Sequence, residues 1–167
     1  MEKLIEFSNK KEVKIYVDTK WLFEQTMGKN MNASDILIKI NAIESYFSTE
    51  RYGMDLYNKM QQVRVGGNLK IEREKANNEE KFISLINSFK ENGFNDEYPL
   101  ELNKDYEVFE GSHRLACALY FNIEKVPVVF NEKLWELKYD YSPNWFKNNG
   151  LEEHIMILEK MKEKYKK

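Results

Sequence analysis

The sequence predicts a mixed α+β domain, and three observations support that class. Short runs rich in β-branched and aromatic residues are typical of strands, and they occur at 12–17, 99–103, 106–110 and 125–130. Apolar residues recur at helical spacing in four longer segments, at 32–48, 53–65, 77–92 and 150–167. A single glycine, Gly111, separates the run at 106–110 from a further helical pattern at 112–121. A strand, a helix and a strand should therefore follow one another between Tyr106 and Phe130.

The first 77 residues predict one strand and two helices. The run EVKIYV at 12–17 alternates in the manner of a strand. Ser34 is the expected N-cap of the first helix, whose apolar stripe is Ile36, Ile40, Ile43 and Phe47. The second helix places Leu56, Met60 and Val63 on one face, and the glycines of the 66–68 segment should end it.

The segment 77–110 predicts a helix followed by a hairpin. Asn78 can cap the helix, acids fill its first turn, and Gly93 stands where a C′ glycine is common. Its buried stripe is Phe82, Leu85, Ile86 and Phe89. The strands 99–103 and 106–110 are expected to join through a tight turn at Lys104–Asp105.

The C-terminal third predicts a helix at 112–121, a buried strand KVPVVF at 125–130 and an amphipathic helix at the end of the chain. We expect Trp145 and Phe146 to fasten that last helix onto the sheet. His154 is expected at the surface.

Composition excludes several classes of protein. With 167 residues and 42% hydrophobic residues, the chain can bury a genuine core as one domain. A net charge of -2 provides no general attraction to nucleic acid. The single cysteine, Cys117, excludes an internal disulfide framework, and we expect it to be a buried packing thiol. No apolar run is long enough to span a bilayer and no signal peptide is recognisable, so a cytoplasmic protein is expected.

The turn EGSHR at 110–114 is the strongest candidate site. A helix N-terminus carries unpaired N–H groups and partial positive charge, and Gly111 lets a ligand approach the backbone. Ser112, His113 and Arg114 lie in the first turn, where they can reach a phosphate or carboxylate. Glu110 can hold Mg²⁺ against phosphate oxygens. The alternative is a plain polar helix start, with Ser112 as a cap and Arg114 paired to a surface acid.

A longer pattern containing this turn resembles the ParB/sulfiredoxin-like fold. It reads INSFKENGF, then YPLELNKDYEVFEGSHRLACALYFNIEKVPVVF, and the resemblance covers about residues 78–130. The resemblance implies one domain over 1–167. In it 1–77 completes the pocket and 131–167 adds a C-terminal helical element.

Three branches of this family differ in chemistry. Sulfiredoxins carry a catalytic cysteine at the position of Ser112, and Cys117 lies five residues later, so sulfur chemistry is not expected. Plasmid-partition ParB proteins have an Arg-rich turn, bind CTP and continue into a helix-turn-helix domain, whereas His113 stands here and few residues follow. The turn is closest to that of small-molecule kinases typified by free serine kinases.

The kinase branch implies a nucleotide phosphate at the turn, Mg²⁺ at Glu110, and an upstream glutamate as base toward a hydroxyl. Glu74 and Glu72 are the candidates for that base, and a solvated acid in a charged loop is the alternative for each. His113 is a candidate catalytic residue. The chain has no P-loop, and one cysteine with two separated histidines cannot close a zinc site.

Arg64 is a further candidate ligand of the phosphate. Tyr57, Gln61 and Arg64 share one helix face, which either lines the pocket or is merely solvated.

We therefore expect a kinase that uses ATP or ADP with Mg²⁺ to phosphorylate a small hydroxyl-bearing molecule. The alternative is a non-catalytic or slowly hydrolysing ParB-like switch that binds a nucleotide or nucleic acid. Membrane and nucleic acid are not the expected partners, and a homodimer stays open.

Overall fold

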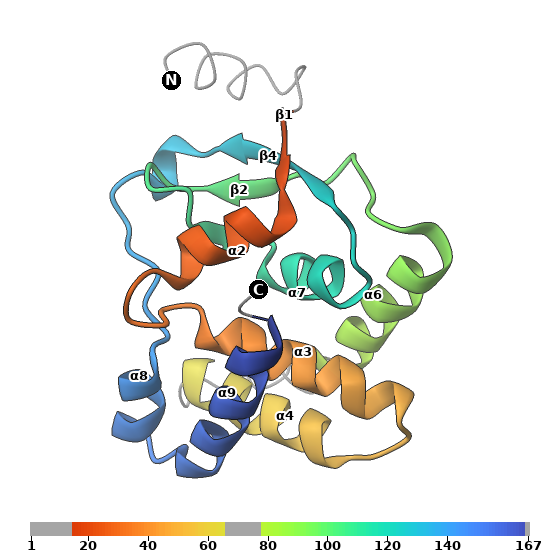
Figure 1. The fold of residues 1–167 in the computed structure, drawn as a ribbon, viewed down its shortest axis with the longest axis vertical. Coiled ribbons are helices and arrows are strands. Elements are labelled where there is room, and N and C mark those ends of the chain that lie inside the picture. The colour runs from red at the N-terminus through yellow and green to blue at the C-terminus, as the bar shows by residue number, and fades with distance from the viewer. Residues whose placement is uncertain (1–14, 66–77, 166–167) are drawn as a thin grey trace.

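The computed structural model describes residues 15–65 and 78–165, and it is a mixed α and β fold (Figure 1). A small sheet lies at one end of the molecule and most of the helices gather at the other. The beginning of the strand predicted at 12–17 and the helix break predicted at 66–68 lie outside the described residues.

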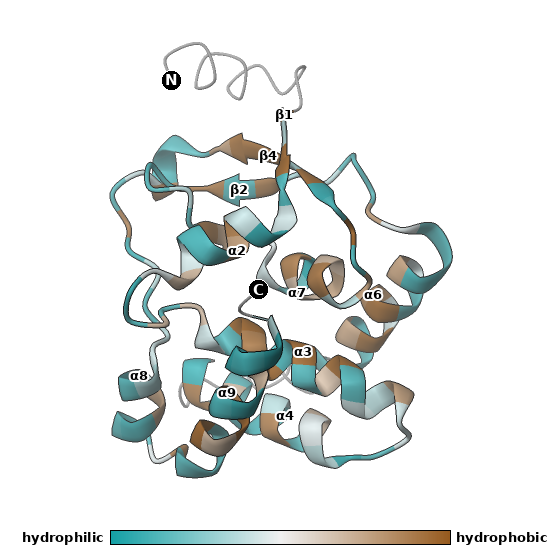
Figure 2. Ribbon diagram, in the orientation of Figure 1, coloured by the Kyte–Doolittle hydropathy of each residue, from teal (hydrophilic) through white to brown (hydrophobic). Residues whose placement is uncertain are grey.

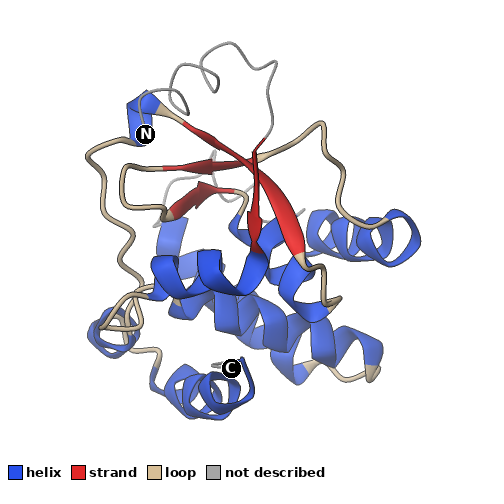
Figure 3. Ribbon diagram, turned by 45° about the horizontal axis from the view of Figure 1, so that its top comes forward, coloured by secondary structure: helices blue, strands red, loops and turns tan. Residues whose placement is uncertain are grey.

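The sheet has four short strands in the order β1-β4-β2-β3 (Figure 3). Its members are β1 (Ile15–Asp18), β2 (Leu100–Leu102), β3 (Val108–Glu110) and β4 (Lys125–Phe130). β4 pairs antiparallel with β1 and parallel with β2, and β3 pairs antiparallel with β2. The predicted strand–helix–strand unit is present as β3, α7 (Ser112–Tyr120) and β4. β2 lies between β3 and β4 in the sheet, so this strand–helix–strand unit connects two strands that are not adjacent.

The β2–β3 connection is longer than the predicted two-residue turn. It runs through Asn103, whose Oδ1 accepts from the backbone N–H of Asp105 and Glu107 at 3.0 and 2.9 Å. The buried Asn103 side chain thus adds to the backbone hydrogen bonds inside the loop, where Asn103 N–H donates to the Glu107 carbonyl and Tyr106 N–H to the Asn103 carbonyl. Tyr106 adopts a positive φ of 63° there. A prediction based only on Lys104–Asp105 could not include this side-chain scaffold.

The helix α2 (Thr19–Met27) was not predicted from the sequence, and neither was the short helix α8 (Pro143–Asn148). Asp18 caps α2 by accepting from the backbone N–H of Trp21 at 2.9 Å, and Gly28 ends it with a φ of 59°. Leu22 and Phe23 face the core. The apolar stripe is short and interrupted by polar residues, so its periodicity is weak in sequence.

The central element is α3 (Ser34–Phe47), which packs against α4 (Tyr52–Val65), α7 and α9 (Glu152–Tyr165). Apolar residues of α3 occupy much of its circumference, as expected for a helix inside the molecule (Figure 2). Ser34 is not its N-cap, because that position belongs to Ala33. The Ser34 hydroxyl instead donates to the Met31 carbonyl at 2.7 Å, one turn back.

The helix predicted at 77–92 is confirmed as α6 (Asn78–Asn92). Phe82, Ile86 and Phe89 are buried, and Gly93 takes the expected left-handed conformation with a φ of 73°. α6 packs against α7. The helix α7 and the strand β4 that follows it are also confirmed close to their predicted bounds. The region 78–130 is therefore the best-predicted part of the fold.

The C-terminal region holds a 3₁₀ turn (Glu132–Leu134), α8 (Pro143–Asn148) and α9. Phe146 is fully buried, as predicted, but α9 packs on α3 and α8 rather than on the sheet. The surface position predicted for His154 is wrong, since it is 1% exposed. Its Nε2 lies 2.8 Å from the Leu56 carbonyl oxygen, which draws the imidazole into the interface with α4. Among the described helices, none has the length and apolarity to cross a membrane.

Candidate functional site

The predicted turn at 110–114 forms the N-terminus of α7. Gly111 is the N-cap with a φ of 106°, and no side chain of the described residues caps the first turn. A Cβ at this position would lie 2.4 Å from Leu100 Cδ2, so the turn requires glycine. The first amides of the helix therefore keep their hydrogen-bonding capacity.

Ser112 meets a buried lysine that the sequence analysis did not identify. Lys39 Nζ of α3 donates to Ser112 Oγ at 2.6 Å and to Asp35 Oδ2 at 3.1 Å. Asp35 and Lys39 are both fully buried. The available signal was an acid and a lysine four residues apart inside the apolar run SDILIKINAI. Water cannot solvate such a pair on an interior helix. The pair therefore needs a hydrogen-bonding partner from another element.

Two further side chains complete what we call the Asp35 cluster, which consists of Asp35, Lys39, Arg64, Ser112 and Tyr139. The Tyr139 hydroxyl donates to Asp35 Oδ2. Arg64 Nη1 lies 3.7 Å from the same oxygen. The second oxygen, Asp35 Oδ1, is buried and accepts no hydrogen bond from the described residues.

Arg64, the predicted phosphate ligand on α4, lies beside Asp35. Its guanidinium donates to Gln61 at 3.0 Å and stacks on the ring of Tyr141, 4.2 Å from the centroid. The Arg64 side chain is 21% exposed while that of Asp35 is not exposed at all. Arg64 is thus the member of the cluster that reaches solvent.

His113 contacts the helix face that carries Arg64. Its Nε2 lies 2.8 Å from the Tyr57 hydroxyl, and its ring packs edge-on against Tyr57 and Phe82. Burial lowers the pKa of His113 well below its usual value, and the positive charges of Lys39 and Arg64 act in the same direction. The imidazole is therefore neutral at pH 7 and serves as a hydrogen-bonding group rather than as a cation.

Arg114 points toward the loop before β2. It donates to the backbone carbonyls of Tyr98 and Pro99. Burial lowers the pKa of Arg114, and the nearby carboxylates of Glu101 and Glu110 oppose that effect. Arg114 consequently holds the segment that leads into β2. A phosphate would have to compete with these two carbonyls for the Arg114 guanidinium.

Glu110, the predicted metal ligand, lies exposed on β3 opposite Glu101 of β2. Across 15–65 and 78–165 there is no group of three acidic, histidine or cysteine side chains arranged to hold a metal. Two neighbouring carboxylates still suit a Mg²⁺ that keeps waters or phosphate oxygens as its other ligands. Glu72 and Glu74, the predicted bases, lie outside the described residues.

The electrostatic balance of the Asp35 cluster is unusual for a protein interior. Burial lowers the pKa of Lys39 to about 8, although Asp35 partly opposes this shift. Lys39 therefore still carries its proton at pH 7. Asp35 raises the pKa of Arg64, and burial raises that of Tyr139, which stays neutral. Among the described residues, two cations thus share one carboxylate beside the positive end of α7.

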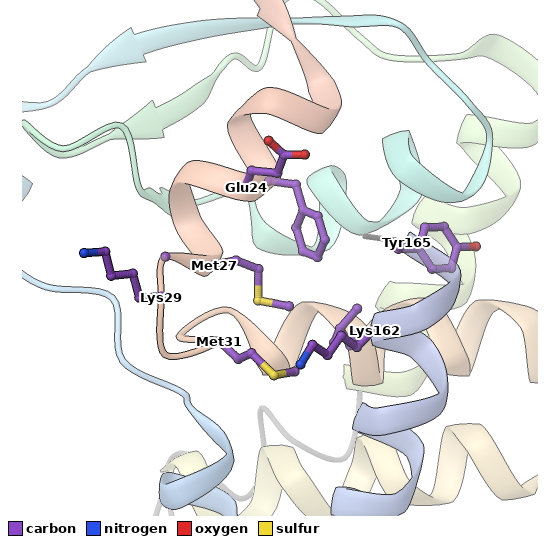
Figure 4. Close-up of a pocket in the computed structure, with 9 residues that line it drawn as sticks. Glu24, Met27, Lys29, Met31, Lys162 and Tyr165 are labelled. Carbon is purple, nitrogen blue, oxygen red and sulfur yellow. The ribbon is translucent and has the colours of Figure 1, made fainter. Parts of the chain in front are cut away.

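Two hollows lie near this region. An open, polar cleft of about 670 Å³ is lined by Glu107, Lys138, Tyr139 and Ser142 among others, and the Tyr139 hydroxyl also donates to Asp35. A cavity of about 380 Å³ lies between the end of α2, the start of α3 and the end of α9 (Figure 4). Met27 and Met31 project into it beside Lys162 and Tyr165.

Comparisons with protein-family models, curated proteins and solved structures found no match to this chain.

Proposed function

We propose that this protein is a ParB/sulfiredoxin-like kinase. In this proposal it binds the phosphates of a nucleotide at the N-terminus of α7 and transfers a phosphoryl group to a hydroxyl of a small molecule. The observation that carries the proposal is the surplus of positive charge in the Asp35 cluster. Among the described residues, Lys39 and Arg64 face a single carboxylate, Asp35, next to a helix N-terminus that none of those residues caps with a side chain. Buried charges in proteins are normally paired, and a phosphate would balance this surplus.

Unfilled hydrogen-bonding capacity at the same place supports the proposal. An ammonium group has three donors, and within the described residues Lys39 donates to Asp35 and Ser112. One donor is left for a ligand oxygen. Asp35 Oδ1 offers an acceptor without a partner among those residues. A ligand carrying both an anionic group and a hydroxyl would satisfy the two together.

The division of roles follows from these contacts. Lys39, Arg64 and the first amides of α7 would bind the transferred phosphate, and such preorganised cations and amides are the main requirement of phosphoryl transfer. His113, kept neutral by burial and by the nearby cations, would donate or accept one hydrogen bond, as it does with Tyr57. Mg²⁺ would approach through Glu110 and lower the repulsion between the phosphates. Glu74 or Glu72 remains the proposed base.

The first test is nucleotide binding by thermal shift, with ATP, ADP and CTP, each with and without Mg²⁺. Binding at a hundred times Kd contributes about 2.7 kcal/mol, and for a chain of this length that raises Tm by about 5–11 °C. Arg64→Met should abolish most of the shift. The matched control is Lys59→Met on the same helix, because Lys59 is 60% exposed and pairs only with Glu153 at 3.5 Å.

The second test separates a kinase from a switch. ATP labelled at its γ-phosphate is incubated with the protein and a panel of amino-acid and sugar hydroxyls. Transfer to one of them supports the kinase. Binding with slow hydrolysis and dimer closure, but no transfer, would instead identify a ParB-like switch. Absence of any nucleotide-induced shift would overturn both.

A further inference from the structure

Ser112 has the surroundings of a nucleophile. Its Oγ lies 2.6 Å from Lys39 Nζ, and the two side chains come from α7 and α3, 73 residues apart. Lys39 is fully buried and Ser112 is 8% exposed, so little water competes for this contact. A serine hydroxyl is a weak nucleophile until an adjacent base accepts its proton.

The groups that face Lys39 favour its action as that base. Asp35 of its own helix attracts the proton, whereas Arg64 of α4 repels it and burial disfavours the charge. Tyr139 and His113 stand nearby and are both neutral at pH 7. With a pKa of about 8, Lys39 exchanges its proton close to neutral pH, far below an ordinary lysine.

The position also suits the product of a nucleophilic attack. Ser112 is the first residue of α7, where a phosphate group is stabilised by the helix dipole and by free amides. Lys39 and Arg64 would face the new charges. Asp35 Oδ1, which accepts no hydrogen bond from the described residues, is a second group in this cluster that a donor from a ligand would satisfy.

We infer that Ser112 itself receives the phosphoryl group, so that the kinase works through a phosphoserine intermediate. The inference rests on the proposed function for its nucleoside triphosphate donor. Lys39 first releases its own proton to solvent. Ser112 Oγ then forms a bond to the γ-phosphorus while the bond from that phosphorus to the leaving nucleoside diphosphate breaks, and the serine proton passes to the neutral Lys39 Nζ. In the second step the acceptor hydroxyl attacks the phosphorus and the bond to Oγ breaks. Lys39 then returns its proton to Ser112, and the acceptor's proton leaves to solvent.

The test incubates the full chain with γ-labelled ATP and Mg²⁺, followed by peptide mapping. We expect an acid-stable label on Ser112 that disappears in Ser112→Ala and persists in Ser142→Ala, a control serine that is 9% exposed. Lys39→Arg keeps the cation but cannot accept a proton. Labelling of Ser112 in this variant should therefore fall at least tenfold. At saturating ATP, labelling should become faster as pH rises through about 8.

Steady-state kinetics of the unmodified protein provide a measurement that needs no variant. A phosphoserine intermediate predicts ping-pong kinetics, whereas direct transfer predicts a ternary complex. Undiminished transfer by folded Ser112→Ala, or ternary-complex kinetics, would overturn the inference and leave the proposed kinase intact. Failure of every nucleotide to bind would overturn both, because no phosphoryl donor would then be held.

Discussion

The buried pair of Asp35 and Lys39 allows a quantitative prediction. Lys39→Met removes the closest cation from Asp35 and the donor from Ser112. Breaking a buried ion pair from one side costs about 3–5 kcal/mol. Asp35 would keep Tyr139 and, at 3.7 Å, Arg64. We therefore expect a loss at the lower end, about 3 kcal/mol, which lowers Tm by about 6–12 °C.

The double-mutant cycle isolates the interaction itself. Asp35→Asn leaves Lys39 and Arg64 without their shared carboxylate, and it should also cost about 3 kcal/mol, because Lys39 can release its proton instead of remaining charged. In the double variant neither an uncompensated carboxylate nor a buried ammonium remains. Its loss should be smaller than the sum of the single losses by about 1–3 kcal/mol.

Urea denaturation followed by tryptophan fluorescence measures the cycle, provided that the m value stays constant. The exposed pair Lys59–Glu153 is the control, and Lys59→Met should change stability by less than about 0.5 kcal/mol. The reasoning that these charges depend on one another would be refuted if the two cluster substitutions had additive effects on the free energy of unfolding. It would also be refuted if Lys39→Met lost no more stability than Lys59→Met.

Two further predictions concern the turn and the two histidines. Gly111→Ala should destabilise by more than about 2 kcal/mol, because its Cβ would overlap a methyl group of β2 and a guanidinium nitrogen. Gly93→Ala, also at positive φ but with no atom within 4 Å, should cost about 1–2 kcal/mol, and equal losses in urea would contradict the steric argument. Burial lowers the pKa of both His113 and His154. The unfolded chain therefore binds more protons below pH 6.5, and stability should fall on acidification toward pH 5 by up to about 1.4 kcal/mol per pH unit for each histidine. Urea midpoints at several pH values check this, and His154→Phe should flatten the slope.

Local patterns predicted the region 78–130 well. The helix of α6 follows from its apolar stripe and from Gly93, and the start of α7 follows from Gly111 and Ser112. These signals depend on residues within a few positions of one another. Backbone sterics and the periodicity of apolar residues are therefore sufficient to predict where these helices begin and end. α2 was missed because its short stripe holds only Leu22 and Phe23, and its ends depend on a cap.

The surroundings of histidine and arginine side chains were harder to predict. His154 has charged neighbours in sequence, yet a carbonyl of α4 and the ring of Phe146 hold it inside. Arg114 stands in the predicted anion site but donates to the Tyr98 carbonyl. Long or amphipathic side chains choose among several partners, and that choice depends on which elements pack nearby.

The sequence by itself determined that a glycine-led turn carries a serine, a histidine and an arginine into the first turn of a helix. It also determined that the face with Tyr57 and Arg64 combines polar and aromatic groups. Only the tertiary structure decided that Lys39 would lie against Ser112 and that Tyr139, 104 residues from Asp35, would share its carboxylate. The physical reason is that hydrogen bonding and turn geometry act over neighbouring residues, whereas the meeting of buried charges depends on how α3, α4 and α7 cross. Those crossings are selected by the packing of the whole core.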